Sequence, residues 1–156
     1  MIRIEMEDGG IIDIELDPKA APITCANFEK LVKEGFYDGL TFHRIIKGFM
    51  IQGGCPKGNG TGDANEKIKG EFASNGVKNP LLHERGVISM ARSMDKNSAS
   101  CQFFIMHADA PHLDGAYAAF GKVVSGMDVV DRIAETKTGF NDKPRKKQVI
   151  KTISMV

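Results

Sequence analysis

The chain has 156 residues, of which 42% are hydrophobic and 26% are charged, and its formal net charge is +1. This composition suits one globular domain over residues 1–156, and it excludes the strong positive field that would attract nucleic acid or an anionic membrane. No apolar run approaches a membrane span, and the charged opening MIRIEMEDGG argues against a signal peptide, so we expect a cytoplasmic protein.

The first forty residues predict a hairpin followed by a helix. Apolar residues alternate with charged residues over 2–7 and 12–17, and Asp8-Gly9-Gly10 supplies a turn between the two strands. The period then changes to that of a helix, which begins around Pro22 and Thr24 and ends at Gly35. One face of this helix carries Ala26, Phe28, Leu31 and Val32.

The rest of the chain reads as strands joined by loops, with one late helix. Residues 40–52 are apolar and rich in β-formers, the glycine-rich stretch 53–62 is a loop, and residues 64–85 are polar and irregular. Strands follow at 86–91, 101–108 and 118–124, then a short helix in 125–138, a basic loop at 139–148 and a closing strand at 149–156. About eight strands and two helices favour a mainly β fold, an antiparallel barrel closed at its ends by helices, although periodicity alone also permits a sandwich.

The sequence lacks several motifs that would indicate other classes of function. GAYAAFGKV (115–123) has five residues between its glycines and Val123 where a phosphate loop needs Ser or Thr, and no GxSxG presents a nucleophile. The histidines show no zinc-ligand spacing, and we expect His83 and His107 at the surface or at strand edges. KPRKK (143–147) reads as a solvated loop rather than a nucleic-acid contact, because no aromatic residue interleaves it. The three cysteines form no CxxC, so we expect reduced thiols.

Three segments set polar side chains among large apolar ones: FHRIIKGFMIQGG (42–54), SMARS (89–93) and QFFIMHADAPHLDG (102–115). Each has a plain structural explanation when taken alone. Arg44 could lie on the solvent face of a strand, the large apolar residues could be core, and Gln52 and Gln102 could satisfy buried backbone groups.

Taken in order, and together with GNGTG and LDG…Y…FGKV, these segments resemble the cyclophilin family of peptidyl-prolyl cis-trans isomerases, in its bacterial single-domain form. The resemblance covers nearly the whole chain. It implies a closed eight-stranded antiparallel β-barrel capped by two α-helices. It also implies an enzyme that rotates X-Pro bonds in peptides and in unfolded or partly folded proteins, assisting their folding, without a metal or another cofactor. We expect it to act as a monomer, without nucleic acid or a membrane.

The resemblance also assigns roles to individual residues. It places the catalytic group at Arg44, supported by Gln52 and with His43 beside it, and it puts Phe49 among the catalytic residues as part of the proline pocket. The other pocket residues are Met50, Phe103 and Leu113. The groove for residues preceding the proline falls on Ala91, Arg92 and Gln102, and Tyr117 lies at the rim, where the family often has histidine.

The sequence departs from the family pattern at a few of these positions. His112 stands where cyclosporin-sensitive members have tryptophan, so we expect cyclosporin to bind weakly while catalysis is intact. Arg92 replaces a frequent asparagine and is expected to add a charge that favours acidic residues near the substrate proline. Lys47 replaces proline in a turn outside the site.

Three other interpretations remain open from the sequence. A non-catalytic module that binds proline peptides would keep the pocket, and a structural or assembly protein would use its surface loops instead. A hydrolase is disfavoured because no nucleophile–base pair is present.

Overall fold

The computed structural model describes all residues from Met1 to Val156. Eight strands form one antiparallel sheet in the order β3-β4-β6-β5-β7-β2-β1-β8. The strands are β1 (Ile2–Met6), β2 (Ile11–Leu16), β3 (Phe42–Ile46), β4 (Met50–Gly53), β5 (Val87–Met90), β6 (Phe103–Met106), β7 (Ala119–Ser125) and β8 (Ile150–Met155). The helices are α1 (Pro22–Lys33) and α2 (Met127–Ala134), and 3₁₀ turns occupy Ala73–Asn75, Pro111–Leu113 and Phe140–Asp142.

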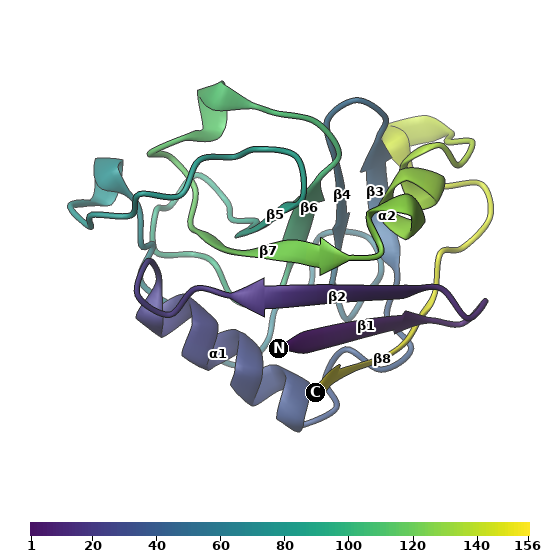
Figure 1. The fold of residues 1–156 in the computed structure, drawn as a ribbon, viewed down its shortest axis with the longest axis horizontal. Coiled ribbons are helices and arrows are strands. Elements are labelled where there is room, and N and C mark those ends of the chain that lie inside the picture. Colours follow the sequence, from purple (N-terminus) through teal and green to yellow (C-terminus); the bar gives the residue numbers. More distant parts are fainter.

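The sheet curls until its two end strands nearly meet. Strands β1, β2 and β7 run across the view of Figure 1, whereas β3 and β4 run almost perpendicular to them. The end strands β3 and β8 share no ladder, but an isolated bridge between Thr41 and Val149 and a 3.0 Å bond from the Phe42 amide to the Gln148 carbonyl join the segments beside them. The predicted eight-stranded antiparallel fold with two helices is confirmed, and the single curled sheet excludes the sandwich.

The core fills the inside of this curl. Along β1, Ile2, Ile4 and Met6 are buried while the residues between them are partly exposed, as the alternation of the sequence predicts. The apolar face of α1 closes one end, where the Phe28 ring packs against the rings of Tyr37, Phe103 and Phe120 at 5.2 to 5.5 Å. Neither α-helix is long and apolar enough to cross a membrane.

A buried carboxylate organises the start of α1. The helix begins at Pro22 as expected, but its N-cap residue Ala21 offers no side-chain bond. Instead, Glu71 accepts bonds from the Thr24 amide at 2.6 Å and the Thr24 hydroxyl at 2.7 Å. A carboxylate at this position satisfies free helix N–H groups and complements the positive end of the helix dipole.

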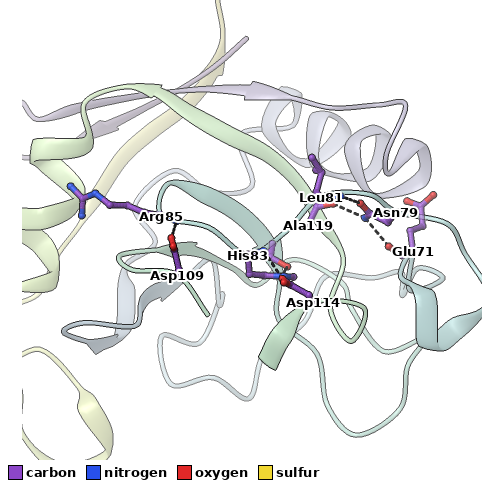
Figure 2. Close-up of polar contacts among 9 residues, drawn as sticks. Glu71, Asn79, Leu81, His83, Arg85, Asp109, Asp114 and Ala119 are labelled. Atoms are coloured by element: carbon purple, nitrogen blue, oxygen red, sulfur yellow. Dashed lines mark hydrogen bonds and ion pairs between the residues drawn. The ribbon is translucent and has the colours of Figure 1, made fainter. Parts of the chain in front are cut away.

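The irregular segment 64–85 is fixed by side chains that bind backbone groups (Figure 2). The Asn79 amide donates to the carbonyls of Glu71 and Ala119, both at 2.9 Å, and its oxygen accepts from the Leu81 amide. This segment therefore holds a defined path beside β7 without being a strand.

Candidate functional site

Strands β4 and β6 carry apolar side chains on both faces. Ile51, Phe103 and Ile105 point into the main core, whereas their neighbours point to the outside of the curl. Those outward residues form a second buried cluster with the segment that follows β6. Its members are Met50, Val87, Phe104, Met106, Ala110, Leu113 and Ala119. The outer face of the sheet therefore has its own apolar floor.

A cavity of about 300 Å³ opens above this floor, and we call it the central cavity. Its apolar walls are Phe49, Met50, Ala91, Phe104, Leu113 and Tyr117. Its polar rim consists of Arg44, Gln52 and Arg92. Eight predicted site residues thus line one cavity, although they come from three separate stretches of the chain.

The ninth lining residue is Phe104, whereas the sequence analysis placed Phe103 in the pocket. That prediction is wrong. Phe103 is fully buried in the core, with its ring edge-on to those of Phe28, Tyr37 and Phe42. Successive side chains of a strand point to opposite faces, so only one of the two phenylalanines can reach the cavity. Gln102, which also lies toward the groove, shares the face of Phe104, and this alternation could have identified the right residue.

A chain of hydrogen bonds runs along the polar edge of the central cavity. Arg44 and Gln52 are cross-strand partners, and the Arg44 Nη1 lies 3.5 Å from the Gln52 Oε1. The Gln52 Nε2 donates to the Gln102 Oε1 at 3.1 Å, and the Gln102 Nε2 donates to the Gly60 and Gly62 carbonyls. Both amides are therefore oriented, while most of the five N–H donors of Arg44 remain free for a ligand.

The buried ring of His83 packs against the Phe104 ring, whereas we expected His83 at the surface or at a strand edge. It is 1% exposed and stacks on Phe104 with the ring centroids 6.1 Å apart. Its Nδ1 lies 3.0 Å from the Asp114 Oδ1 and its Nε2 lies 2.9 Å from the Ser89 hydroxyl (Figure 2 shows the pair with Asp114). Because a carboxylate only accepts, Nδ1 donates to Asp114 and Nε2 accepts from Ser89. His107, just after β6, accepts from the Gly48 amide at 2.8 Å.

The protein should lose stability as the pH falls below neutrality. Burial is the largest cause that lowers the pKa of His83, and the same holds for His43. In the unfolded chain, these histidines bind protons as the pH falls through their ordinary pKa near 6.5. In the folded chain they bind protons only at a lower pH. Urea unfolding between pH 7.5 and 5.5 should show a falling free energy of unfolding, by at most about 1.4 kcal/mol per pH unit for each histidine. The slope should be smaller in His83→Asn, and a flat profile in the wild type would refute the burial argument.

Two further cavities flank the central one and share Gln52 with it. The first, of about 320 Å³, we call the Ala91 cavity. Its lining includes Gln102, Ala91, Arg92, Asp63 and Lys67. The second, of about 520 Å³, we call the His43 cavity, and it lies on the Arg44 side. Its lining includes His43, Arg44, Asn59, Phe140, Asp142 and Lys143. Each of these two cavities shares lining residues with the central cavity, and both also share Gly60 with each other, so the three form one continuous groove.

His43 is the wall of the His43 cavity nearest to Arg44. Its side chain is 7% exposed, and neither ring nitrogen has a hydrogen-bond partner. Burial lowers its pKa, and the nearby positive charges of Arg44 and Lys143 lower it further. The ring is therefore neutral at neutral pH and adds no charge of its own.

Arg92 is held at the rim by contacts with two aromatic rings and by bonds to backbone carbonyls. Its guanidinium carbon lies 5.0 Å from the Phe72 ring centroid and 4.6 Å from that of Tyr117. Its Nε and Nη2 donate to the Ala116 carbonyl at 3.2 and 2.7 Å, and its Nη1 donates to the Ser93 carbonyl. With these donors committed and both rings close to its guanidinium, Arg92 fixes Tyr117 at the rim.

Comparisons with known proteins agree with this architecture. Residues 1–155 match the family model described as cyclophilin type peptidyl-prolyl cis-trans isomerase/CLD. Peptidyl-prolyl cis-trans isomerase B of Bacillus subtilis is 54% identical over 79% of this chain and 82% of its own, and a Helicobacter pylori peptidyl-prolyl cis-trans isomerase is 48% identical over 81% and 76%. A crystal structure of a Cryptosporidium parvum cyclophilin type isomerase, in the presence of the dipeptide Ala-Pro, superposes with a TM-score of 0.91. That protein is 32% identical, and the match covers 99% of this chain and 98% of the other.

Proposed function

The chain belongs to the cyclophilin-type peptidyl-prolyl cis-trans isomerase family and is a peptidyl-prolyl cis-trans isomerase, and from this premise we propose that the reaction takes place in the central cavity. Arg44 acts on the X-Pro bond while the apolar walls hold the proline ring. The substrates are proline-containing segments of peptides and of unfolded or partly folded proteins.

One observation carries this proposal: an arginine with free donors stands at the edge of an apolar cavity. Arg44 has a single long contact to Gln52, and the walls beside it are Phe49, Met50, Phe104 and Leu113. The cavity volume of about 300 Å³ is at the small end of ligand pockets, which suits one five-membered ring. The relative solved in the presence of Ala-Pro supports a ligand of this type.

The chemistry requires no bond to be made or broken. Rotation about a peptide bond meets a barrier of about 18–20 kcal/mol because the nitrogen lone pair is delocalised into the carbonyl. In the twisted state that lone pair returns to nitrogen, which then accepts a hydrogen bond better than the planar form does. A guanidinium is always charged and only donates, so Arg44 stabilises the twisted state more than either planar state.

The apolar walls supply a second contribution. They anchor the proline ring on one side of the bond, so that the other side can rotate, and they exclude water from the nitrogen that Arg44 addresses. In such surroundings a hydrogen bond from a charged donor is stronger than in water. Gln52 and Gln102 hold the polar edge in place, and we assign the residues preceding the proline to the Ala91 cavity.

A protease-coupled assay on a proline peptide tests the proposal. Purified protein should accelerate conversion of the cis form to the cleavable trans form, at a rate proportional to enzyme concentration. A module that only binds proline peptides would retain the peptide without accelerating the exchange. Binding without acceleration would therefore refute the proposed mechanism.

Cyclosporin should bind this protein weakly. His112 is exposed at the rim, with its ring 5.7 Å from the Phe49 ring. An imidazole offers a smaller apolar surface than the indole that cyclosporin-sensitive members of the family carry at this position. Inhibition should need far more than nanomolar cyclosporin, and His112→Trp should tighten it at least tenfold with unchanged turnover. Nanomolar inhibition of the wild type would contradict this expectation.

A further inference from the structure

A cluster of lysines lies beside the groove, on the Arg44 side. Lys57, Lys143 and Lys147 line one small cavity of about 160 Å³, together with Thr41, Phe42, His43, Gly58, Pro144 and Gln148. We call this cavity the lysine subsite. It shares His43, Gly58 and Lys143 with the His43 cavity, so it continues the groove outward from Arg44.

We propose that the lysine subsite binds an acidic side chain located a few residues after the substrate proline, so that the enzyme prefers segments with Asp or Glu in that position. This inference rests on the proposed function, because it needs the proline in the central cavity and the preceding residues in the Ala91 cavity. In this proposal the chain after the proline leaves past Arg44 through the His43 cavity, which shares Arg44 and Gln52 with the central cavity.

The charges in this region are unbalanced. None of the ion pairs in the structure involves Lys57, Lys143 or Lys147. No acidic residue lines the lysine subsite, and Asp142 is the one acidic residue that lines the adjoining His43 cavity. Three unpaired cations around one hollow repel one another, and a carboxylate between them offsets part of that repulsion.

The backbone that carries these lysines is well anchored. The turn before Lys143 is closed by a bridge between Thr138 and Pro144 and by a 2.8 Å bond from the Gly139 amide to the Lys143 carbonyl. Beyond Lys147, the Gln148 carbonyl accepts from the Phe42 amide of β3 at 3.0 Å. On the opposite wall, the loop with Lys57 is closed by a bond from the Gly58 amide to the Cys55 carbonyl. The lysines are thus presented from ordered backbone next to the site.

The location of the cluster favours a substrate side chain over a nucleic acid. The cavity is small and continuous with the groove, and the net charge of the whole chain is only +1. A phosphate backbone is bound by basic residues spread over a longer surface. A single carboxylate on a peptide already held in the groove fits the observed size and position.

Matched peptides test the inference. Each pair shares an Ala-Pro centre and differs by Glu or Gln at the second, third or fourth position after the proline. We expect kcat/KM for the best Glu peptide to exceed that of its Gln partner by roughly three- to tenfold at low salt, as three weak exposed ion pairs together would give. The ratio should approach one at about 1 M salt, where the Debye length is about 3 Å.

Charge variants identify the residues responsible. The triple variant Lys57→Gln, Lys143→Gln, Lys147→Gln should bring the Glu-to-Gln ratio close to one. The control Lys19→Gln, Lys33→Gln, Lys122→Gln removes the same charge from exposed sites elsewhere and should keep the ratio.

The outcomes separate this inference from the proposed function. No turnover of either peptide would refute the proposed function, whereas equal turnover of both by the wild type would overturn the lysine subsite alone. The inference would also be overturned if the triple variant lost affinity for a single-stranded oligonucleotide while its peptide ratio stayed unchanged.

Discussion

Replacing Arg44 by alanine should lower kcat/KM for a proline peptide by roughly ten- to a hundredfold, with the fold intact. A hydrogen bond from a charged donor contributes about 1.5–3 kcal/mol net, which corresponds to that range of rates. Arg44 lies on the exposed side of β3 and its only side-chain bond is the long contact to Gln52, so its removal leaves no cavity in the core. The protease-coupled assay measures the rate, and thermal unfolding measures the fold.

The matched control for this variant is Arg145→Ala. Arg145 is also an exposed arginine, but it lines none of the cavities of the groove. It should keep wild-type turnover. Arg44→Lys should recover only part of the activity, because an ammonium lacks the planar fork of the guanidinium. Wild-type activity in Arg44→Ala would remove Arg44 from the mechanism.

Replacing Phe103 by alanine should lower the free energy of unfolding by about 3–5 kcal/mol, as expected for a buried aromatic ring. Phe103 is 0% exposed and packs edge-on against three aromatic rings of the core. Its neighbour Phe104 should behave differently, because it lines the central cavity and packs against Tyr117 at its rim. Its loss should mainly raise the KM.

The milder changes Phe103→Leu and Phe104→Leu separate the two roles without unfolding the protein. Urea unfolding gives the stability of each variant, and steady-state kinetics below its unfolding transition gives the KM. We expect a KM near the wild-type value for Phe103→Leu and a several-fold higher KM for Phe104→Leu. An equal rise in both variants would show that the cavity does not distinguish the two faces of β6.

Local patterns in the sequence were enough to predict the strands and both helices, whereas the residues of the groove were predicted from the resemblance to the cyclophilin family. Alternation over β1 and over residues 12–16 of β2 identifies strands with one buried face, and the change of period after Pro22 identifies α1. Counted from Gln102, the same alternation places Phe104 on the groove face of β6 and Phe103 on the core face.

Other features depend on contacts between distant parts of the chain. The burial of His83 rests on Asp114, 31 residues away, and on the stacked ring of Phe104. The arrangement around Arg92 requires Phe72 and Tyr117, from two other segments of the chain, to lie next to its guanidinium. A local pattern carries no information about contacts of this kind, so the sequence alone predicted a surface position for the buried His83.

The central claim is that Arg44 accelerates rotation of a proline bond held in the apolar cavity. NMR exchange spectroscopy tests it most directly, on an Ala-Pro peptide mixed with wild-type protein or with Arg44→Ala at concentrations where both bind the peptide equally. The account predicts fast cis–trans exchange with the wild type, and with Arg44→Ala an exchange at least tenfold slower at the same bound fraction. Equal exchange rates with the two proteins would contradict it.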